Sequence, residues 1–238
     1  MRNWIKFDGT SLGTYGLYCS GSGAYNAPAR SVEMIQIPGR NGDLVGAPTR
    51  LQNMIVTYPC FIAGVNFKTN IADLRNFLLS KIGYKKLEDS YNADEYRLAV
   101  YSGAFNANVE NTLNGANFDL EFNCKPQRYL NSGDTFTDFT ANGTINNPTR
   151  FAAKPYLKIY GKGQVTIGSD VITIASAYPY SYIEIDCEIG MAYYSTLNAN
   201  SYVTTSRIDF PELAPGNTGI ALGTGITEVK VKPRWWRL

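Results

Sequence analysis

The segment Ile37–Leu44 constrains the fold of this chain most strongly, because it places the turn dipeptides Pro38-Gly39 and Asn41-Gly42 between stretches with strand character. Proline presets φ, and glycine readily adopts the positive φ that tight turns require. Asn-Gly is also a strong hairpin signal when alternating residues flank it. The sequence therefore predicts that the chain reverses here between two strands and exposes the charges of Arg40 and Asp43.

The composition favours a mainly β protein with more than one domain. Charged residues make up 18% of the 238 residues, and the chain contains 22 Gly and 17 Tyr beside many Thr and Asn. Tyr and Thr prefer strands, whereas Gly and Asn prefer turns. A chain of this length has room for two domains of ordinary size.

One helix is expected, at residues 70–82, where apolar side chains recur at helical spacing. The buried stripe of this helix would consist of Ile71, Leu74, Phe77 and Leu78. Further along, Gly115–Cys124 alternates strictly between apolar and polar residues, which is typical of a strand with one face in the core. A helix among strands predicts an N-terminal β domain, sandwich-like or α+β-like, with one packed helix at residues 1–131.

The stretch 132–150 is rich in Ser, Gly, Thr, Asp and Asn and has no periodicity, so we interpret it as a linker. From residue 151 to 238, short strand patterns recur with turn residues between them and no helix pattern interrupts them. This region is expected to form a C-terminal all-β sandwich.

Several functional classes are disfavoured by charge and motifs. The formal net charge is +2, Lys and Arg are not clustered apart from short groups, and histidine is absent. Avid DNA binding requires clustered cations, and histidine is the commonest general base and metal ligand. Neither HExxH nor a phosphate-binding glycine motif occurs. We therefore expect a protein that is not an enzyme, with no catalytic, cofactor or metal residues and no specific nucleic-acid ligand.

The four cysteines Cys19, Cys60, Cys124 and Cys187 are widely spaced and form no CxxC pair, which disfavours zinc binding and redox exchange. Reduced thiols are expected, and the last three lie in apolar or aromatic runs where cysteine behaves as a small buried hydrophobe. No signal-peptide pattern and no stretch of about 20 apolar residues is present. We expect synthesis and maturation in the cytosol without membrane insertion.

Three acids offer the sharpest enzymatic alternative. Glu184, Asp186 and Glu188 would project from one face of a strand, with neighbours about 6–7 Å apart. This spacing overlaps the range of about 5–9.5 Å for paired glycosidase carboxylates. A glycoside hydrolase using Glu184 and Glu188 and a calcium site are both alternatives. The favoured interpretation is a solvated or subunit-facing surface, because Ile183 and Ile185 occupy the opposite face.

The paired tryptophans Trp235 and Trp236 stand among cations at the end of the chain. Such rings can stack on sugars or exposed bases, so a carbohydrate-binding β-sandwich module for host-surface adhesion is an alternative function. Large aromatics also commonly tie down a terminal strand. The numerous tyrosines serve mainly in sheets, and a minority is expected at an interface.

Several motifs, in this order, resemble the distal tail proteins of siphophages. They are the hairpin junction Pro38–Leu44, the helix at Ile71–Leu79, Lys125-Pro126-Gln127-Arg128-Tyr129, Gly161-x-Gly163, Ile185-Asp186-Cys187-Glu188, Phe210-Pro211-x-Leu213-x-Pro215-Gly216-Asn217 and the basic-aromatic end Pro233-Arg234-Trp235-Trp236.

The resemblance implies a non-catalytic hub at the phage tail tip, assembled in the host cytoplasm. Its N-terminal domain would build a homohexameric ring whose lumen DNA only transits, and a galectin-like sandwich would point outward. The ring would join the tail tube protein to the tip lysin and carry receptor-binding proteins. Arg40, Asn41 and Asp43 are the expected subunit contacts, because opposite charges on a rigid turn can fix the register between copies.

Overall fold

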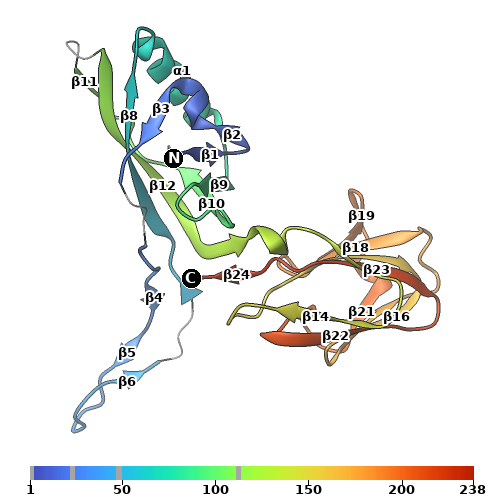
Figure 1. The fold of residues 1–238 in the computed structure, drawn as a ribbon. Helices are drawn as coiled ribbons and strands as arrows, with labels where there is room; N and C mark the ends of the chain where they lie inside the picture. The colour runs from blue at the N-terminus through green and yellow to red at the C-terminus, as the bar shows by residue number, and fades with distance from the viewer. Residues whose placement is uncertain (1–2, 22–24, 47–49, 111–113) are drawn as a thin grey trace. The chain divides into compact units, whose positions relative to one another are not determined.

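The computed structural model describes residues 3–21, 25–46, 50–110 and 114–238. Met1 and Arg2, which begin the N-terminal stretch that has no signal-peptide pattern, lie outside these described residues. The chain is mainly β and divides into two compact units, one ending at Arg128 and the other spanning Tyr129–Arg237 (Figure 1). Within the described ranges, no helix has the length and apolarity that a membrane crossing requires.

A single sheet organises the first unit. In spatial order its strands are β2 (Thr10–Ser11), β1 (Ile5–Phe7), β9 (Lys85–Asp89), β10 (Glu95–Tyr101), β12 (Gly115–Leu130), β8 (Met54–Ala63) and β3 (Leu17–Cys19), with β11 (Asn108–Glu110) beside β12. The short helix η1 (Leu12–Tyr15) connects β2 to β3.

The central pair of this sheet is β8 with β12, which pair antiparallel from Gly115 opposite Ala63 to Cys124 opposite Met54. Alternate side chains along both strands are buried, and those between them are exposed or half-buried. The predicted alternation is confirmed. The predicted end at Cys124 is too early, because β12 continues to Leu130. Pro126 is tolerated there because it lies beyond the last residue paired with β8.

Helix α1 spans Phe67–Ser80, so the predicted helix at 70–82 is correct in type and shifted at both ends. Phe67 is buried and extends the apolar stripe into the first turn. Asn66 occupies the N-cap position, where asparagine is favoured. At the other end the helix stops before Ile82, whose side chain is 88% exposed. The predicted stripe residues Leu74 and Leu78 are fully buried in the core of this unit.

A two-stranded arm interrupts the chain between β3 and β8. It consists of β4 (Arg30–Ser31) paired with β7 (Arg50–Leu51), and β5 (Met34–Ile35) paired with β6 (Leu44–Val45). The chain reversal predicted at Ile37–Leu44 is therefore confirmed. Figure 1 shows β5 and β6 as the outer part of this arm.

The second unit is a sandwich of two sheets around a separate apolar core. One sheet has the order β13 (Thr137–Phe139), β23 (Ile226–Lys232), β15 (Tyr156–Gly161), β18 (Tyr182–Asp186), β19 (Met191–Tyr194), β20 (Leu197–Asn198). The other has the order β14 (Gly143–Asn147), β22 (Gly216–Leu222), β16 (Gly163–Ile167), β17 (Asp170–Ile174), β21 (Val203–Thr205). The remaining elements of the unit are η3 (Asn131–Gly133), η4 (Asn200–Tyr202) and β24 (Trp236–Arg237).

The predicted linker at 132–150 is wrong for much of its length, because β13 and β14 fall within it. Each is an edge strand of one sheet, β13 beside β23 and β14 beside β22. Polar side chains suit an edge strand, and here they are also used in hydrogen bonds. The amide of Asn147, which is buried, donates to the carbonyls of Phe151 and Leu213. The prediction from composition alone therefore missed these two strands.

The β8–β12 core gives a first prediction. Phe122 is fully buried and packs its ring against Phe7, Tyr58 and Tyr101 at centroid distances of 5.1, 6.1 and 5.5 Å. Phe122→Ala should lower the free energy of unfolding by about 3–5 kcal/mol, because it removes apolar contacts and leaves a cavity. Phe61→Ala, on the open face of the same strand pair, should cost less than about 1.5 kcal/mol. Urea unfolding followed by circular dichroism measures both, and equal losses would contradict the burial pattern.

Candidate assembly surface

The arm exposes apolar side chains on both of its strands. Every residue from Val32 to Val45 is exposed, and this run includes six large apolar side chains. They are Val32, Met34, Ile35, Ile37, Leu44 and Val45. Monomeric soluble proteins rarely leave contiguous apolar surface uncovered, and such a patch usually marks an interaction site.

The backbone of the arm is a regular ribbon closed by a tight turn. Ile35 faces Leu44 and Met34 faces Val45, and the N–H of Gly46 donates to the carbonyl of Glu33 at 2.8 Å. At the tip, the N–H of Arg40 donates to the carbonyl of Ile37 across Pro38-Gly39. Gly39 has φ of 79°, which a turn with proline at its second position and glycine at its third requires.

The three predicted contact residues lie together at this tip. Arg40, Asn41 and Asp43 are all exposed. Their side chains form no ion pair or side-chain hydrogen bond with any residue in the described ranges. Their proposed role in subunit contacts is untested and stays a prediction. The sequence predicts strands on both sides of the turn but does not mark their apolar residues as a surface. Both faces of the stretch Val32–Ile37 carry apolar side chains, so the alternation does not show which face is open.

The outer face of the β8–β12 pair is a second open surface. Asn117, Asp119 and Glu121 of β12 project from it, and Phe61 of β8 lies beside them, directly opposite Asn117. A cavity of about 610 Å³ adjoins this face and is lined by these residues together with Ser20, Pro59, Cys60, Phe118, Ala104, Asn106 and Asn108. Its side chains are acids, amides and aromatic rings, with no cation among them.

The tryptophan platform considered from the sequence is wrong for Trp235, which is only 5% exposed and belongs to the core of the second unit. Trp236 stacks on Phe151 at 4.4 Å, and its indole N–H donates to the carbonyl of Ala152. A Cβ on Gly133 would overlap the backbone nitrogen of Trp235, so the terminal segment lies tightly against this glycine. The rings therefore anchor the end of the chain, and contact of Trp236 with a sugar stays a prediction.

The three acids are not arranged on one strand face as predicted. The strand ends at Asp186, so Glu188 lies in the following turn and not on the predicted face. Glu184 pairs with Lys158 at 3.6 Å, and Arg234 donates to both carboxylate oxygens of Asp186 at 2.7 and 2.8 Å. In the part of the chain that the structure describes, no cluster of three acid or cysteine side chains could hold a metal ion.

The Asp186–Arg234 pair fixes the terminal segment electrostatically. Burial acts to raise the pKa of Asp186, but the hydrogen bonds and the positive charge of Arg234 outweigh it. The pKa of Asp186 therefore lies below its ordinary value of 3.8. The N–H of Glu188 adds a further hydrogen bond to the same carboxylate. This pair holds the terminal segment to the end of β18.

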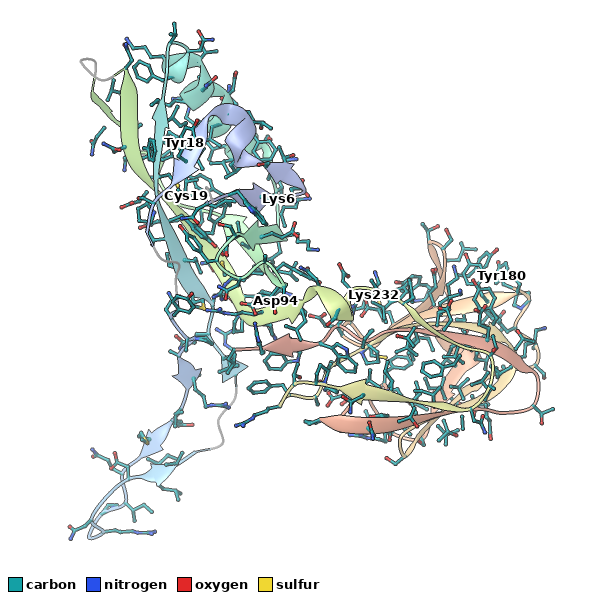
Figure 2. All side chains as sticks on the ribbon, viewed as in Figure 1. Lys6, Tyr18, Cys19, Asp94, Tyr180 and Lys232 are labelled. Carbon is teal, nitrogen blue, oxygen red and sulfur yellow. The ribbon has the colours of Figure 1, made fainter. Side chains whose placement is uncertain are left out.

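Several tyrosines gather at the end of the sheet where β18 begins and β19 ends. Tyr180, labelled in Figure 2, stacks on Tyr194 at 4.1 Å, and Tyr194 lies 4.7 Å from Tyr182. The ammonium of Lys158 lies 3.8 Å from the centre of the Tyr182 ring. Partly exposed tyrosines beside cations are typical of interfaces. The expectation that a minority of tyrosines serves an interface stays a prediction, with this row as its candidate.

Comparison with solved structures establishes the class of fold: it is the fold of hub and baseplate proteins of phage tails. The chain is similar to the SPP1 Dit protein (gp 19.1), described as a paradigm of the hub adsorption apparatus in phages that infect Gram-positive bacteria. The identity is 15% over 100% of both chains, with a TM-score of 0.70. The resemblance to distal tail proteins is thereby confirmed at the level of the fold.

Two structures of the phage P2 baseplate in its activated conformation are also similar. The structure with Ca matches at 12% identity over 97% of this chain and 98% of that chain, with a TM-score of 0.54. The structure with Sr matches at 12% identity over 99% and 98%, with a TM-score of 0.53. No protein-family model and no curated protein matches the sequence.

The Asp186–Arg234 pair gives a prediction with a defined pH dependence. Asp186→Asn should reduce the free energy of unfolding by about 1.5–3 kcal/mol at pH 7, because it weakens two charge-assisted hydrogen bonds. The folded-state pKa lies below the unfolded value, so the contribution is complete above the ordinary value of 3.8 and is lost as the pH falls through the lowered pKa. Urea unfolding at pH 7 and pH 2.5 measures the difference.

The matched control for this prediction is Glu212→Gln. Glu212 pairs with Lys154 at 3.6 Å, and both side chains are exposed. Exposed pairs contribute at most about 1 kcal/mol, so this variant should change stability little at either pH. A loss in Asp186→Asn that stayed constant from pH 7 to pH 2.5 would contradict the assignment.

Proposed function

We propose that this protein is a structural hub of a phage tail tip, in which six copies form a ring through their first units. The ring joins the tail tube protein to the tail-associated lysin and carries receptor-binding proteins. The protein is assembled in the host cytoplasm, resides in the virion tail and makes or breaks no covalent bond. The observation that carries the proposal is the exposed apolar arm on a chain whose whole length matches a hub protein in fold.

The arm supplies the driving force for ring formation in this proposal. A two-stranded hairpin is marginally stable by itself in water, and the six large apolar side chains of this one are exposed and belong to no described core cluster. Burying one such side chain contributes about 1.5–3 kcal/mol. An arm that extends from one copy and packs on the next makes a heterologous, head-to-tail contact. Such contacts generate a closed ring when the rotation that relates successive copies adds up to a full turn.

The charge of the first unit suits a ring that DNA passes through. Residues 1–131 contain 13 basic and 11 acidic side chains. We place the open face of β8 and β12 toward the lumen, because over the stretch where the two strands pair it carries Asp119 and Glu121 and no Lys or Arg. Phosphate contacts by Lys and Arg provide most of the affinity of proteins for DNA without sequence preference. A lumen with acids and amides therefore lets DNA pass without holding it.

Charging the apolar arm tests the proposed function. In the double variant Ile35→Asp, Leu44→Asp, two side chains that face each other across the arm become carboxylates. Assembly should weaken by more than about 100-fold in Kd, because at least two buried apolar contacts are lost at each interface. Native mass spectrometry of the full chain over a concentration series measures the change, with rings of six copies expected for the unmodified protein.

Ile82→Asp is the control, because Ile82 is also exposed, at 88% against 42% for Ile35 and 48% for Leu44, but lies outside the arm. It should assemble like the unmodified protein. The melting temperature of each variant, measured where the chain is monomeric, should stay within about 2 °C, since surface changes shift stability by less than about 0.5 kcal/mol. An unmodified chain that remains monomeric beside purified tail-tip partners, or an arm variant that assembles normally, would contradict the proposal.

The charged tip of the arm should act through electrostatics. Arg40→Glu is expected to weaken assembly by roughly 10-fold at low salt, and the loss should shrink at 0.5 M salt as the charges are screened. Arg75→Glu on the exposed side of α1 is the control and should have no effect on assembly. A salt-independent loss in Arg40→Glu, or an equal loss in Arg75→Glu, would show that Arg40 makes no charged contact between copies.

A further inference from the structure

Cys19 and Cys60 lie opposite each other at the edge of the first unit's sheet. In the antiparallel pair of β3 with β8, Cys19 is the register partner of Cys60. Their sulfur atoms are 3.6 Å apart, and both thiols are free and buried. Cys19 is labelled on β3 in Figure 2. They are 41 positions apart in sequence, so no local pattern indicates that they are in contact.

The strand register places the two cysteines where a disulfide fits. The N–H of Ser20 donates to the carbonyl of Pro59 at 2.9 Å, so the adjoining pair Cys19–Cys60 occupies a position without direct backbone hydrogen bonds. At such positions the Cα atoms are about 4.5 Å apart. Disulfides span Cα distances of about 4.4–6.8 Å. Side-chain rotation can therefore bring the sulfurs into bonding distance without moving the strands.

Cys60 borders solvent on one side of β8, although its thiol belongs to the buried side of the strand. Cys60 lines the cavity of about 610 Å³ on the open face, beside Ser20 and Phe61. The hydrogen bond with Cys19 and the burial of the thiol raise the pKa of Cys60. The thiolate is the reactive form, so the pair is inert in a reducing compartment and reacts slowly at neutral pH. Cys124 and Cys187 are also buried, and burial raises the pKa of each thiol to about 12.

We propose that Cys19 and Cys60 are an oxidation site that closes to an intramolecular disulfide under oxidising conditions. With a low-molecular-weight disulfide as oxidant, one cysteine thiolate attacks a sulfur of the oxidant, forms a mixed disulfide and releases one thiol. The other cysteine then loses its proton and attacks the cysteine sulfur of the mixed disulfide, which releases the second thiol. Two cysteine thiols are oxidised, and one small disulfide is reduced to two thiols.

The bond would close the base of the arm. The segment between Cys19 and Cys60 contains β4 to β7, and β3 is the edge strand that holds the beginning of this segment to the sheet. A disulfide here ties that edge strand covalently to β8 and restricts the unfolded chain over the whole loop. Disulfides persist outside the reducing cytosol. While the thiols are reduced, only non-covalent contacts would hold β3 to β8 at the base of the arm. After oxidation the two strands would be linked covalently there.

The experiment uses the full chain treated with oxidised glutathione at pH 8.5 and compared with a sample kept in reductant. Thiol titration in denaturant should fall from four free thiols to two, and peptide mapping should show Cys19 linked to Cys60. The melting temperature of the first unit should rise by roughly 5–10 °C, because the closed loop restricts the unfolded chain.

Two variants separate this result from general thiol reactivity. The double variant Cys124→Ser, Cys187→Ser should lose both remaining thiols on oxidation and show the same thermal shift. Cys19→Ser should form no intramolecular bond and show no such rise. The proposal is overturned if Cys19 and Cys60 stay free while the urea-unfolded chain is oxidised by the same treatment. It is also overturned if either pairs with another cysteine, or if the linked protein melts at a lower temperature.

Discussion

The rest of the first unit depends on the antiparallel pairing of β8 with β12. Ten residues of β8 are in register with β12, so one set of alternating side chains must face the core and the other must face outward. The core set holds α1 and the outer strands by apolar packing. The outward set is exposed or half-buried along both strands. The same pairing thus produces both a stable core and an open face.

The arm also consists of paired antiparallel strands, but its residues belong to no described hydrophobic core. It joins the sheet directly before β8, so a rigid strand pair supports one end of it, while its large apolar residues from Val32 to Val45 are exposed within one copy. The free-energy cost of exposing these side chains is removed when another surface covers them. The second unit differs, because its two sheets bury each other and the Asp186–Arg234 pair and Trp235 fix the end of the chain.

Local signals in the sequence predicted the parts of the structure that local physics determines. The reversal at Ile37–Leu44, the alternation in β12 and the stripe of α1 follow from turn chemistry and periodicity. Tertiary contacts decided the rest. Helix α1 begins earlier than predicted, because Phe67 is buried in the core. The polar stretch predicted as a linker contains the strands β13 and β14, because each pairs with the edge of a sheet. Burial of Trp235 and the juxtaposition of Cys19 with Cys60 depend on residues far away in sequence, so no local pattern could predict them.

Hydrogen exchange of the arm's backbone amides in the assembled protein tests the central claim most directly. If copies of this chain bind one another through the arm, the amides of Met34, Ile35, Leu44 and Val45 should be strongly protected in the assembled species and exchange rapidly in dilute, monomeric protein. Rapid exchange of these amides in an assembled particle would contradict the account, because the apolar arm would then remain in water.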